Sequence, residues 1–309
     1  MSVNNIKYIL KVLIAVFIFS FLVDKLVYFG LNKLNAKVYS GQGAGKLNQF
    51  LKIKDSVNLL VFGSSRANHN VDNIRLDSNS FNMGVDGRSI AYFTTLIKLL
   101  SSRPQILLIQ MDPENACDNT YTGNDIEPLK ALYNKNNIVK AELDKLNLSN
   151  PFQNIYWSIS YNAKVFGMLS NSIRPKYDYT KYYGYDPIEV TNDQRIIFEN
   201  ILKEKKEDTC AEKLVLNRLF YNYLQELKQT ATTKNKKLIF FTSPVYADRC
   251  KSDNEFLSKL MKANELAYFD FSDFFKSNNS LNYWKDEIHL SGIGASLFTD
   301  SLKNILAGK

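Results

Sequence analysis

Two histidines, His69 and His289, are the only imidazole groups in the 309-residue chain, so at most two acid–base centres could use histidine. His289 stands in the run KDEIHLSGIGA, with Asp286 three residues before it. At this spacing in a turn, a carboxylate can reach imidazole Nδ1 and leave Nε2 free to take a proton from a nucleophile. An aspartate that caps a turn beside a packed histidine would give the same pattern.

A serine hydroxyl attacks only when a neighbouring base takes its proton. Ser65 follows an apolar run in VFGSSRA, where Gly63 permits a tight turn and places the serine at the carboxyl end of a strand. The sequence therefore predicts Ser65 as the nucleophile. The alternative is an ordinary loop in which Ser64 or Ser65 caps a short helix.

A third polar segment, FNMGVDGRS at residues 81–89, follows a short expected strand and precedes a helix. Gly87 or its neighbours could offer a backbone N–H to an oxyanion, assisted by the positive end of the following helix. A flexible turn would use the same glycine.

Short continuous apolar runs predict the strands that position these residues, because such runs suit a parallel sheet covered on both faces. The runs lie at residues 57–63, 104–111, 236–244 and 266–272. Helical patterns lie at residues 89–102, 211–231, 254–264 and 293–306. This alternation predicts an α/β fold, a three-layer α/β/α sandwich with a mainly parallel sheet.

Residues 120–210 break that rhythm and are rich in Tyr and Asn. We interpret them as an insertion or lid over the carboxyl ends of the strands, where open α/β sheets bind ligands. The tyrosines could stack on sugar rings or pack against the domain.

The N-terminal segment reads YILKVLIAVFIFSFLV from residue 8, and the apolar pattern continues to residue 31. A helix of this length can cross a bilayer of ~30 Å, with Lys11 snorkelling to one face. Asp24 and Lys25 follow instead of the small residues that a cleavage site requires, so we expect a retained transmembrane anchor. A hydrophobic helix packed on the domain is the alternative. Residues 1–40 would then be anchor and linker, and residues 41–309 the catalytic domain.

The formal net charge of +8 is spread over 39 basic and 31 acidic residues, which disfavours nucleic acid and suits anionic lipid or an anionic cell-wall polymer. The basic residues around the N-terminal helix do not settle its orientation. Cys117, Cys210 and Cys250 lack the close spacing of metal or redox motifs. Outside the cytoplasm Cys210 could pair with Cys250; three buried thiols are the alternative. We expect neither a metal nor a cofactor.

Together the three polar blocks resemble those of the SGNH (GDSL-like) hydrolase superfamily over residues 55–308, interrupted by residues 120–210. That family has Gly-Asp-Ser after its first strand, an oxyanion turn in its second block and Asp-x-x-His in its last. The resemblance implies that Ser65 is nucleophile and oxyanion donor, Gly87 a second donor, His289 the general base and Asp286 its orienting carboxylate.

Two departures stand out. Ser64 replaces the family's usual aspartate, which resembles the membrane-anchored branch that includes the D-alanyl transfer protein of lipoteichoic acid and alginate O-acetylation proteins. The third block, usually Gly-x-Asn-Asp, should fall in QMDPENA, where the glycine is missing and Asn115 is a displaced substitute. Loss of one oxyanion donor costs about 3 kcal/mol of transition-state stabilisation.

Three further polar residues lie near the expected site. Arg66 and Arg88 could bind an anionic substrate or be ordinary surface arginines. His69 follows Ser65 too closely to be its base, so we interpret it as a packed or substrate-facing loop histidine.

The resemblance and the anchor together predict a membrane-anchored serine acyltransferase or esterase whose catalytic domain is extracytoplasmic. It would act on O-acyl groups, above all O-acetyl groups, of a cell-envelope polysaccharide through an acyl-enzyme. Expected partners are that polymer, membrane lipid and a membrane-bound O-acyltransferase, with no nucleic acid. The alternatives are a lipid-directed esterase and a catalytically silent scaffold that binds a polysaccharide or an acyltransferase partner.

Overall fold

The structure is a computed structural model that describes residues 3–175, 179–204, 210, 214–248 and 250–308. The chain divides into two compact units, each built from two segments. The helical unit comprises Met1–Asn48 and Glu127–Tyr177, and the sheet unit comprises Gln49–Ile126 and Asp178–Lys309.

The sheet unit is built on five parallel strands in the order β2-β1-β3-β4-β5 among the described residues. Their bounds are β1 Leu59–Phe62, β2 Ser80–Asn82, β3 Gln105–Gln110, β4 Lys236–Thr242 and β5 Tyr268–Asp270. Each apolar run of the sequence contains one of these strands, and β2 ends where the FNMGVDGRS segment begins to turn. The prediction of an α/β fold with a parallel sheet is confirmed.

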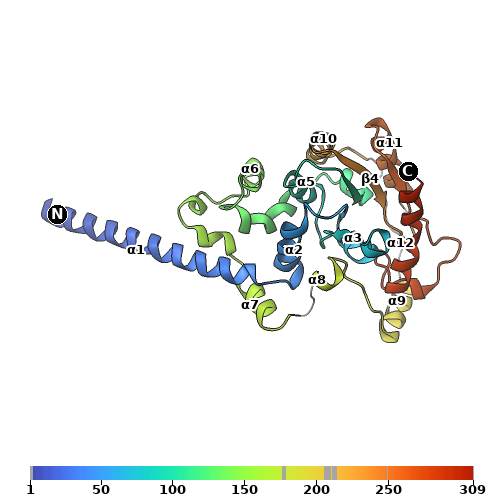
Figure 1. The fold of residues 1–309 in the computed structure, drawn as a ribbon, viewed down its shortest axis with the longest axis horizontal. Coiled ribbons are helices and arrows are strands. Elements are labelled where there is room, and N and C mark those ends of the chain that lie inside the picture. The colour runs from blue at the N-terminus through green and yellow to red at the C-terminus, as the bar shows by residue number, and fades with distance from the viewer. Residues whose placement is uncertain (1–2, 176–178, 205–209, 211–213, 249, 309) are drawn as a thin grey trace. The chain divides into compact units, whose positions relative to one another are not determined.

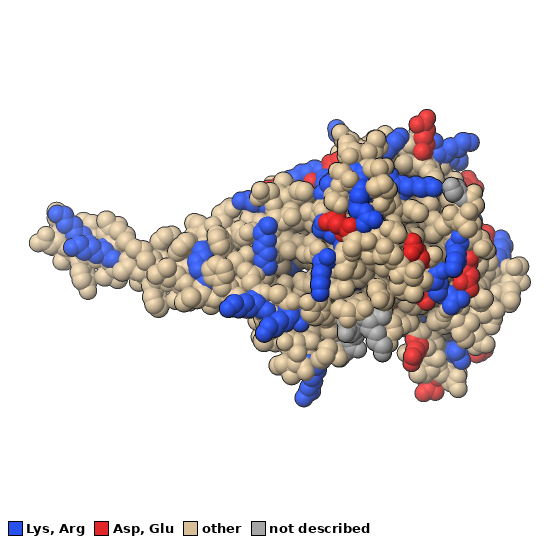
Figure 2. All heavy atoms as spheres, in the orientation of Figure 1, with Lys and Arg blue, Asp and Glu red and all other residues tan. Residues whose placement is uncertain are grey.

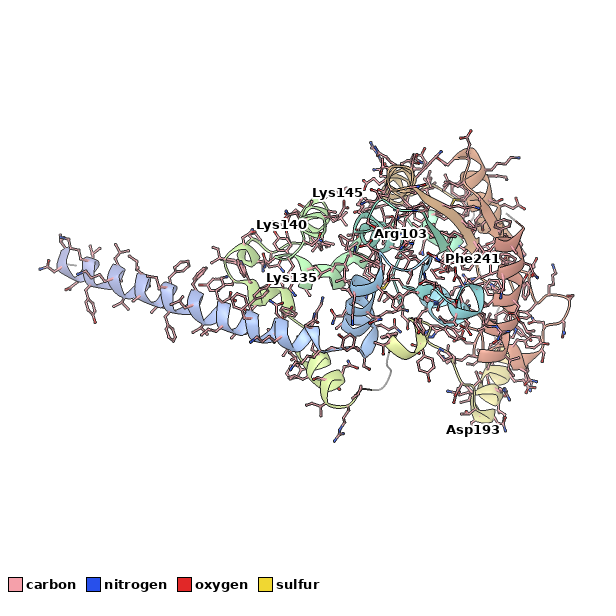
Figure 3. All side chains as sticks on the ribbon, viewed as in Figure 1. Arg103, Lys135, Lys140, Lys145, Asp193 and Phe241 are labelled. Atoms are coloured by element: carbon pink, nitrogen blue, oxygen red, sulfur yellow. A yellow bond between two sulfur atoms is a disulfide. The ribbon has the colours of Figure 1, made fainter. Side chains whose placement is uncertain are left out.

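Helices of the sheet unit lie against the strands (Figure 1). Buried apolar side chains form the contact. Phe241 of β4, labelled in Figure 3, lies 6.0 Å from Phe298 of the last helix between ring centroids. The α-helices here are α3 Ser65–Asn70, α4 Asn73–Leu76, α5 Ile90–Lys98, α8 Tyr179–Tyr182, α9 Asn192–Glu204, α10 Arg218–Thr233, α11 Lys251–Ala263 and α12 Gly292–Ala307. Short 3-10 helices are η2 Pro113–Ala116 and η6 Leu281–Tyr283. Helix α12 packs against α3 and α4, whereas α10 packs against α5 and β4.

One helix begins later than the sequence predicts. The pattern at residues 211–231 predicts a single helix, but α10 begins at Arg218 because the Asn217 side chain accepts a hydrogen bond from the Phe220 N–H and caps it there. The first three residues of that predicted helix lie outside the described residues.

The helical unit contains α1, which spans Val3–Ala36 and is long and apolar enough to cross a membrane. In Figure 2 its N-terminal half shows mostly uncharged side chains with a few basic ones and no acidic ones. Its other helices are η1 Gly41–Gly45, α6 Asn137–Lys145, η4 Pro151–Asn154, η5 Trp157–Tyr161 and α7 Val165–Ile173. Helix α2, Lys46–Ile53, and the 3-10 helix η3, Asn124–Leu132, each run across the division between the units.

Cys210 and Cys250 form a disulfide across 40 positions of the sheet unit, and Cys117 is a free thiol. The pairing that the sequence allowed is therefore the one present. A structural disulfide is typical of domains outside the cytoplasm.

Two glycines at the start of α12 give a test of its packing. A Cβ on Gly294 would lie 2.2 Å from the backbone oxygen of Tyr283, whereas a Cβ on Gly292 would meet nothing closer than 3.9 Å. We expect Gly294→Ala to destabilise the fold by about 1–3 kcal/mol through overpacking. Gly292→Ala, the matched control, should keep or slightly raise stability because alanine favours helix. Thermal melts of both variants check this, and equal melting temperatures would contradict the packing described.

Candidate active site

A continuous chain of hydrogen bonds joins Asp286, His289 and Ser65. His289 Nδ1 lies 2.9 Å and 3.0 Å from the two carboxylate oxygens of Asp286. His289 Nε2 lies 2.8 Å from Ser65 Oγ. A carboxylate only accepts hydrogen bonds, so it favours the tautomer with the proton on Nδ1 and leaves Nε2 as the acceptor for the serine hydroxyl.

The turn after β1 places Ser65 at the carboxyl end of the sheet. Gly63 has a φ of +145°, and a Cβ there would lie 2.7 Å from Gln110 Oε1, so the turn requires glycine. Ser64 caps α3 by accepting a hydrogen bond from the Arg66 N–H, and Ser65 is the first helical residue. Ser64 therefore has the helix-capping role that the sequence offered as an alternative, and Ser65, the predicted nucleophile, is its neighbour.

Hydrogen bonds within the segment hold the turn that carries His289. Asp286 Oδ1 accepts hydrogen bonds from the N–H groups of Ile288 and His289 at 3.1 Å and 2.9 Å. An antiparallel bridge pairs Trp284 with Leu290 across the loop. The same carboxylate thus caps the turn and contacts the imidazole, so the two interpretations of the DEIH pattern are compatible.

Asn70, at the last position of α3, fixes this loop relative to Ser65. Its side-chain amide donates to the Ile288 C=O at 3.0 Å, and its oxygen accepts from the Leu290 N–H at 2.9 Å. The two backbone groups flank His289, and Asn70 is fully buried. One short helix therefore carries the serine at its start and a clamp on the histidine loop at its end.

The pKa of Asp286 is lowered by its hydrogen-bond partners. Burial alone would raise it, but the hydrogen bond and charge of His289 and the backbone N–H groups of Ile288 and His289 outweigh that effect. Asp286 therefore stays ionised through the neutral range, as an orienting carboxylate must.

A pocket of about 330 Å³ opens beside the serine. It is lined by Ser64, Ser65, Arg66, Gly87, Arg88, Ser89, Asp112, Glu114, Asn115, Tyr121, Asn124, Asp125 and Ile288. The structure thus brings Gly87 and Asn115 to the same pocket as Ser65, as the predicted oxyanion donors require. Gly87 has a φ of +66°, which glycine adopts without strain.

The two arginines of the pocket have different surroundings. Arg66 is buried and donates to Asp112 Oδ1 at 2.7 Å and to the Ser243 C=O, so its guanidinium ties α3 to the loops after β3 and β4. Arg88 donates to the Asp125 C=O at 3.3 Å. The buried Nε of each arginine has no hydrogen-bond partner among the described residues. Because the charge of Arg66 is already paired with Asp112, Arg88 is the better placed of the two to meet a ligand.

The loop after β3 carries a polar network that the sequence did not reveal. Gln110 Oε1 accepts hydrogen bonds from Ser64 N and Ser64 Oγ at 3.1 Å and 3.0 Å, and its Nε2 donates to Asp112 Oδ1 at 2.8 Å. Asp112 also accepts a hydrogen bond from Arg66 Nη1, so Ser64, Gln110 and Asp112 all have partners in this network. The network fixes the turn immediately before Ser65.

His69 lies in α3 rather than in the loop that the sequence suggested, because the helix capped by Ser64 extends through Asn70. Its Nδ1 is 2.7 Å from the Asp186 C=O and its Nε2 is 3.3 Å from Asp86. Burial lowers the pKa of His69, but hydrogen bonds and charges of Asp86 and Asp186 outweigh this and raise it. Its ring centroid lies 5.7 Å from that of His289.

Asp125 is a second residue that sequence reasoning missed. Its carboxylate accepts hydrogen bonds from the N–H groups of Ser89 and Tyr92 at the start of α5, each at 3.0 Å, and from the Tyr121 hydroxyl at 2.9 Å. Burial raises its pKa. The sequence shows only an aspartate four residues after a tyrosine, and this pattern is too common to identify Asp125 as a site residue.

Removal of the Asn70 clamp should weaken the loop. We expect Asn70→Ala to cost about 1–3 kcal/mol of stability because a buried N–H and a buried C=O lose their partner. The Leu290 amide should then exchange its hydrogen faster. Ser243→Ala is the matched control, since it removes only the 3.0 Å bond between Asn70 and the Ser243 hydroxyl and leaves the loop contacts. Unchanged exchange at Leu290 in Asn70→Ala would contradict the clamp.

The lowered pKa of Asp286 predicts a defined pH dependence. A carboxylate with a depressed folded pKa stabilises the folded state above its unfolded value, 3.8 here, and this contribution is lost as the pH falls through the folded value. The melting temperature of the wild type should therefore exceed that of Asp286→Asn at neutral pH, and the gap should shrink below about pH 4. A gap independent of pH would show that the charge of Asp286 contributes nothing.

The sequence matches no protein-family model and no curated protein significantly.

Proposed function

We propose that this protein is a serine-dependent acyl-transfer enzyme, an acyltransferase or esterase, with Ser65 as nucleophile. The hydrogen-bond chain from Asp286 through His289 to Ser65 Oγ is the observation that carries the proposal. Ser65 Oγ would attack an ester carbonyl while its proton passes to His289 Nε2. The imidazolium, stabilised by Asp286, would return that proton to the departing alcohol and leave an acyl-enzyme.

The second half-reaction needs an acceptor. An acceptor hydroxyl or a water molecule would give its proton to His289 Nε2 and attack the acyl carbonyl. The bond from the acyl carbon to Ser65 Oγ then breaks, and the imidazolium returns the proton to Oγ. The negative oxygen in each step would face the backbone N–H groups of Ser65 and Gly87 and the Asn115 side chain, all of which line the pocket. The presence of these three residues in one pocket supports catalysis over a silent scaffold.

The pocket chemistry favours a carbohydrate over a lipid. Apart from Gly87 and Ile288, the lining residues are polar or charged, and both arginines and three carboxylates are among them. Sugar hydroxyls can exchange hydrogen bonds with such groups, whereas an acyl chain would leave them unpaired. We infer that the acyl group, acetyl above all, is carried on or delivered to an envelope polysaccharide.

The location and finer fold belong to the same proposal. Helix α1 would be a retained membrane anchor, and the disulfide supports an extracytoplasmic site. A membrane-bound O-acyltransferase would be the natural source of acyl groups for an anchored enzyme. The parallel sheet with helices α10 and α12 supports a three-layer sandwich similar to SGNH hydrolases.

Covalent labelling of the serine tests the proposal. A fluorophosphonate should attach to the wild-type protein, with mass spectrometry placing the adduct on Ser65, and Ser65→Ala should lose it. His289→Ala should slow labelling by orders of magnitude because the base is gone.

Ser64→Ala is the matched control, since it removes a neighbouring pocket hydroxyl that serves as a helix cap and costs about 1 kcal/mol of stability. It should retain labelling at Ser65. An adduct that survives in Ser65→Ala, or hydrolysis of a chromogenic acetyl ester at the wild-type rate by that variant, would refute the nucleophile.

A further inference from the structure

Helix α7 of the helical unit turns three large apolar side chains to the outside. Phe166, Leu169 and Ile173 are 86%, 40% and 74% exposed, and their spacing of three and four residues places them on one face of the helix. Met168, on the opposite face, is buried. A contiguous apolar face is unfavourable in water, so an exposed face of this kind indicates an interaction surface.

The segment before α7 carries further apolar groups and lies against α1. Tyr156 OH is 2.9 Å from the Ser20 hydroxyl, and the Lys25 ammonium lies 4.1 Å from the centroid of the Trp157 ring. Phe152 nearby is 62% exposed. This segment therefore flanks the stretch of α1 between Ser20 and Lys25.

That stretch lies near the end of the apolar surface of α1. Large apolar side chains of α1 are exposed from Val3 to Phe29. The part that follows Lys7, from Tyr8 to Phe29, spans about 33 Å, close to the ~30 Å of a hydrocarbon core. Ser20 and Lys25 lie about 14 Å and about 6 Å before Phe29 along the helix axis. Trp157, which contacts Lys25, is therefore the nearer of the two rings to the depth where tryptophan concentrates in membrane proteins.

A buried carboxylate joins the two segments. Asp24 accepts hydrogen bonds from the backbone N–H groups of Trp157 and Ser158 at 2.8 Å and 3.0 Å, and it pairs with Lys25 at 3.1 Å. The pairing satisfies two charges that would otherwise enter lipid without partners. It also fixes the segment at this level of α1.

Charge selects the kind of surface. The helical unit holds 13 of the 39 Lys and Arg residues but only 4 of the 31 Asp and Glu residues, a formal net charge of +9 that leaves −1 for the sheet unit. Lys7 and Lys11 lie at the far end of α1, and without them the unit still carries a formal net charge of +7. Lys164 and Arg174 stand at the two ends of α7. Figure 3 shows more of these basic residues, Lys135, Lys140 and Lys145, in and just before α6. Basic groups around an apolar helical face match an anionic bilayer surface.

We propose that the collar, defined as residues 150–174, lies in the headgroup region of an anionic bilayer, with the Phe166, Leu169 and Ile173 face of α7 inserted among the acyl chains. The inference rests on the proposed anchoring of α1 and adds a second membrane contact that α1 does not require. The basic residues of the helical unit would neutralise lipid phosphates beside it.

Quenching by nitroxide-labelled lipid tests this on the full-length protein. A fluorophore would be attached to single cysteines in a Cys117→Ser background, in which Cys210 and Cys250 remain paired. Phe166→Cys reports the collar, Leu13→Cys reports α1, and Ile196→Cys on α9 is the water-exposed control, 57% exposed. The vesicles contain equal parts of phosphatidylglycerol and phosphatidylcholine.

We expect probes at positions 166 and 13 to be quenched several-fold more than the probe at 196. Replacement of phosphatidylglycerol by phosphatidylcholine should reduce quenching at position 166 and leave position 13 unchanged. Quenching at 13 but not at 166 overturns the collar and leaves the anchor standing, whereas absence of both overturns the anchor as well. A probe at 166 shielded from lipid and from aqueous iodide alike would place a protein chain on this face and refute a lipid surface.

Discussion

Ser65 and His289 are 224 positions apart in the chain, and a hydrogen bond of 2.8 Å between them constrains most of the sheet unit. Parallel strands deliver their following loops to one edge of the sheet, so β1 brings Ser65 to the edge where ligands meet such folds. The histidine arrives from the loop before α12. Asn70 joins the two at the far end of the helix that Ser65 begins, so the length of one short helix sets the distance between Ser65 and the His289 loop.

A second set of buried polar groups fixes the turn that precedes Ser65. Gln110 ends β3, Asp112 lies in the loop that follows and Arg66 lies in α3. Through Arg66 the network reaches the loop after β4. A buried charge is tolerated only when it is paired and hydrogen-bonded. Removal of any one of these residues would therefore leave its partners buried without a hydrogen bond. Several hydrogen bonds, rather than a single contact, therefore fix the turn before Ser65.

Local sequence patterns predicted much of this arrangement, but they did not predict the pairings between residues far apart in the chain. Continuous apolar runs gave the strands, and DEIHLSGIG gave Asp286 and His289, because each signal lies within a few residues. Asn70, Gln110 and Arg66 acquire their roles only when distant loops meet, which one sequence does not specify. Helix α7 carries an apolar pattern typical of a buried face, and only the structure shows that face turned outward.

Since the chain has two histidines, nitrogen-15 NMR of histidine-labelled protein tests the central hydrogen-bond chain with two imidazoles to assign. The account predicts that neutral His289 carries its proton on Nδ1, bonded to Asp286, and that Nε2 is an unprotonated acceptor whose shift changes in Ser65→Ala. A proton on Nε2 of His289 in the wild-type protein would contradict it, because that nitrogen could then not accept the serine proton.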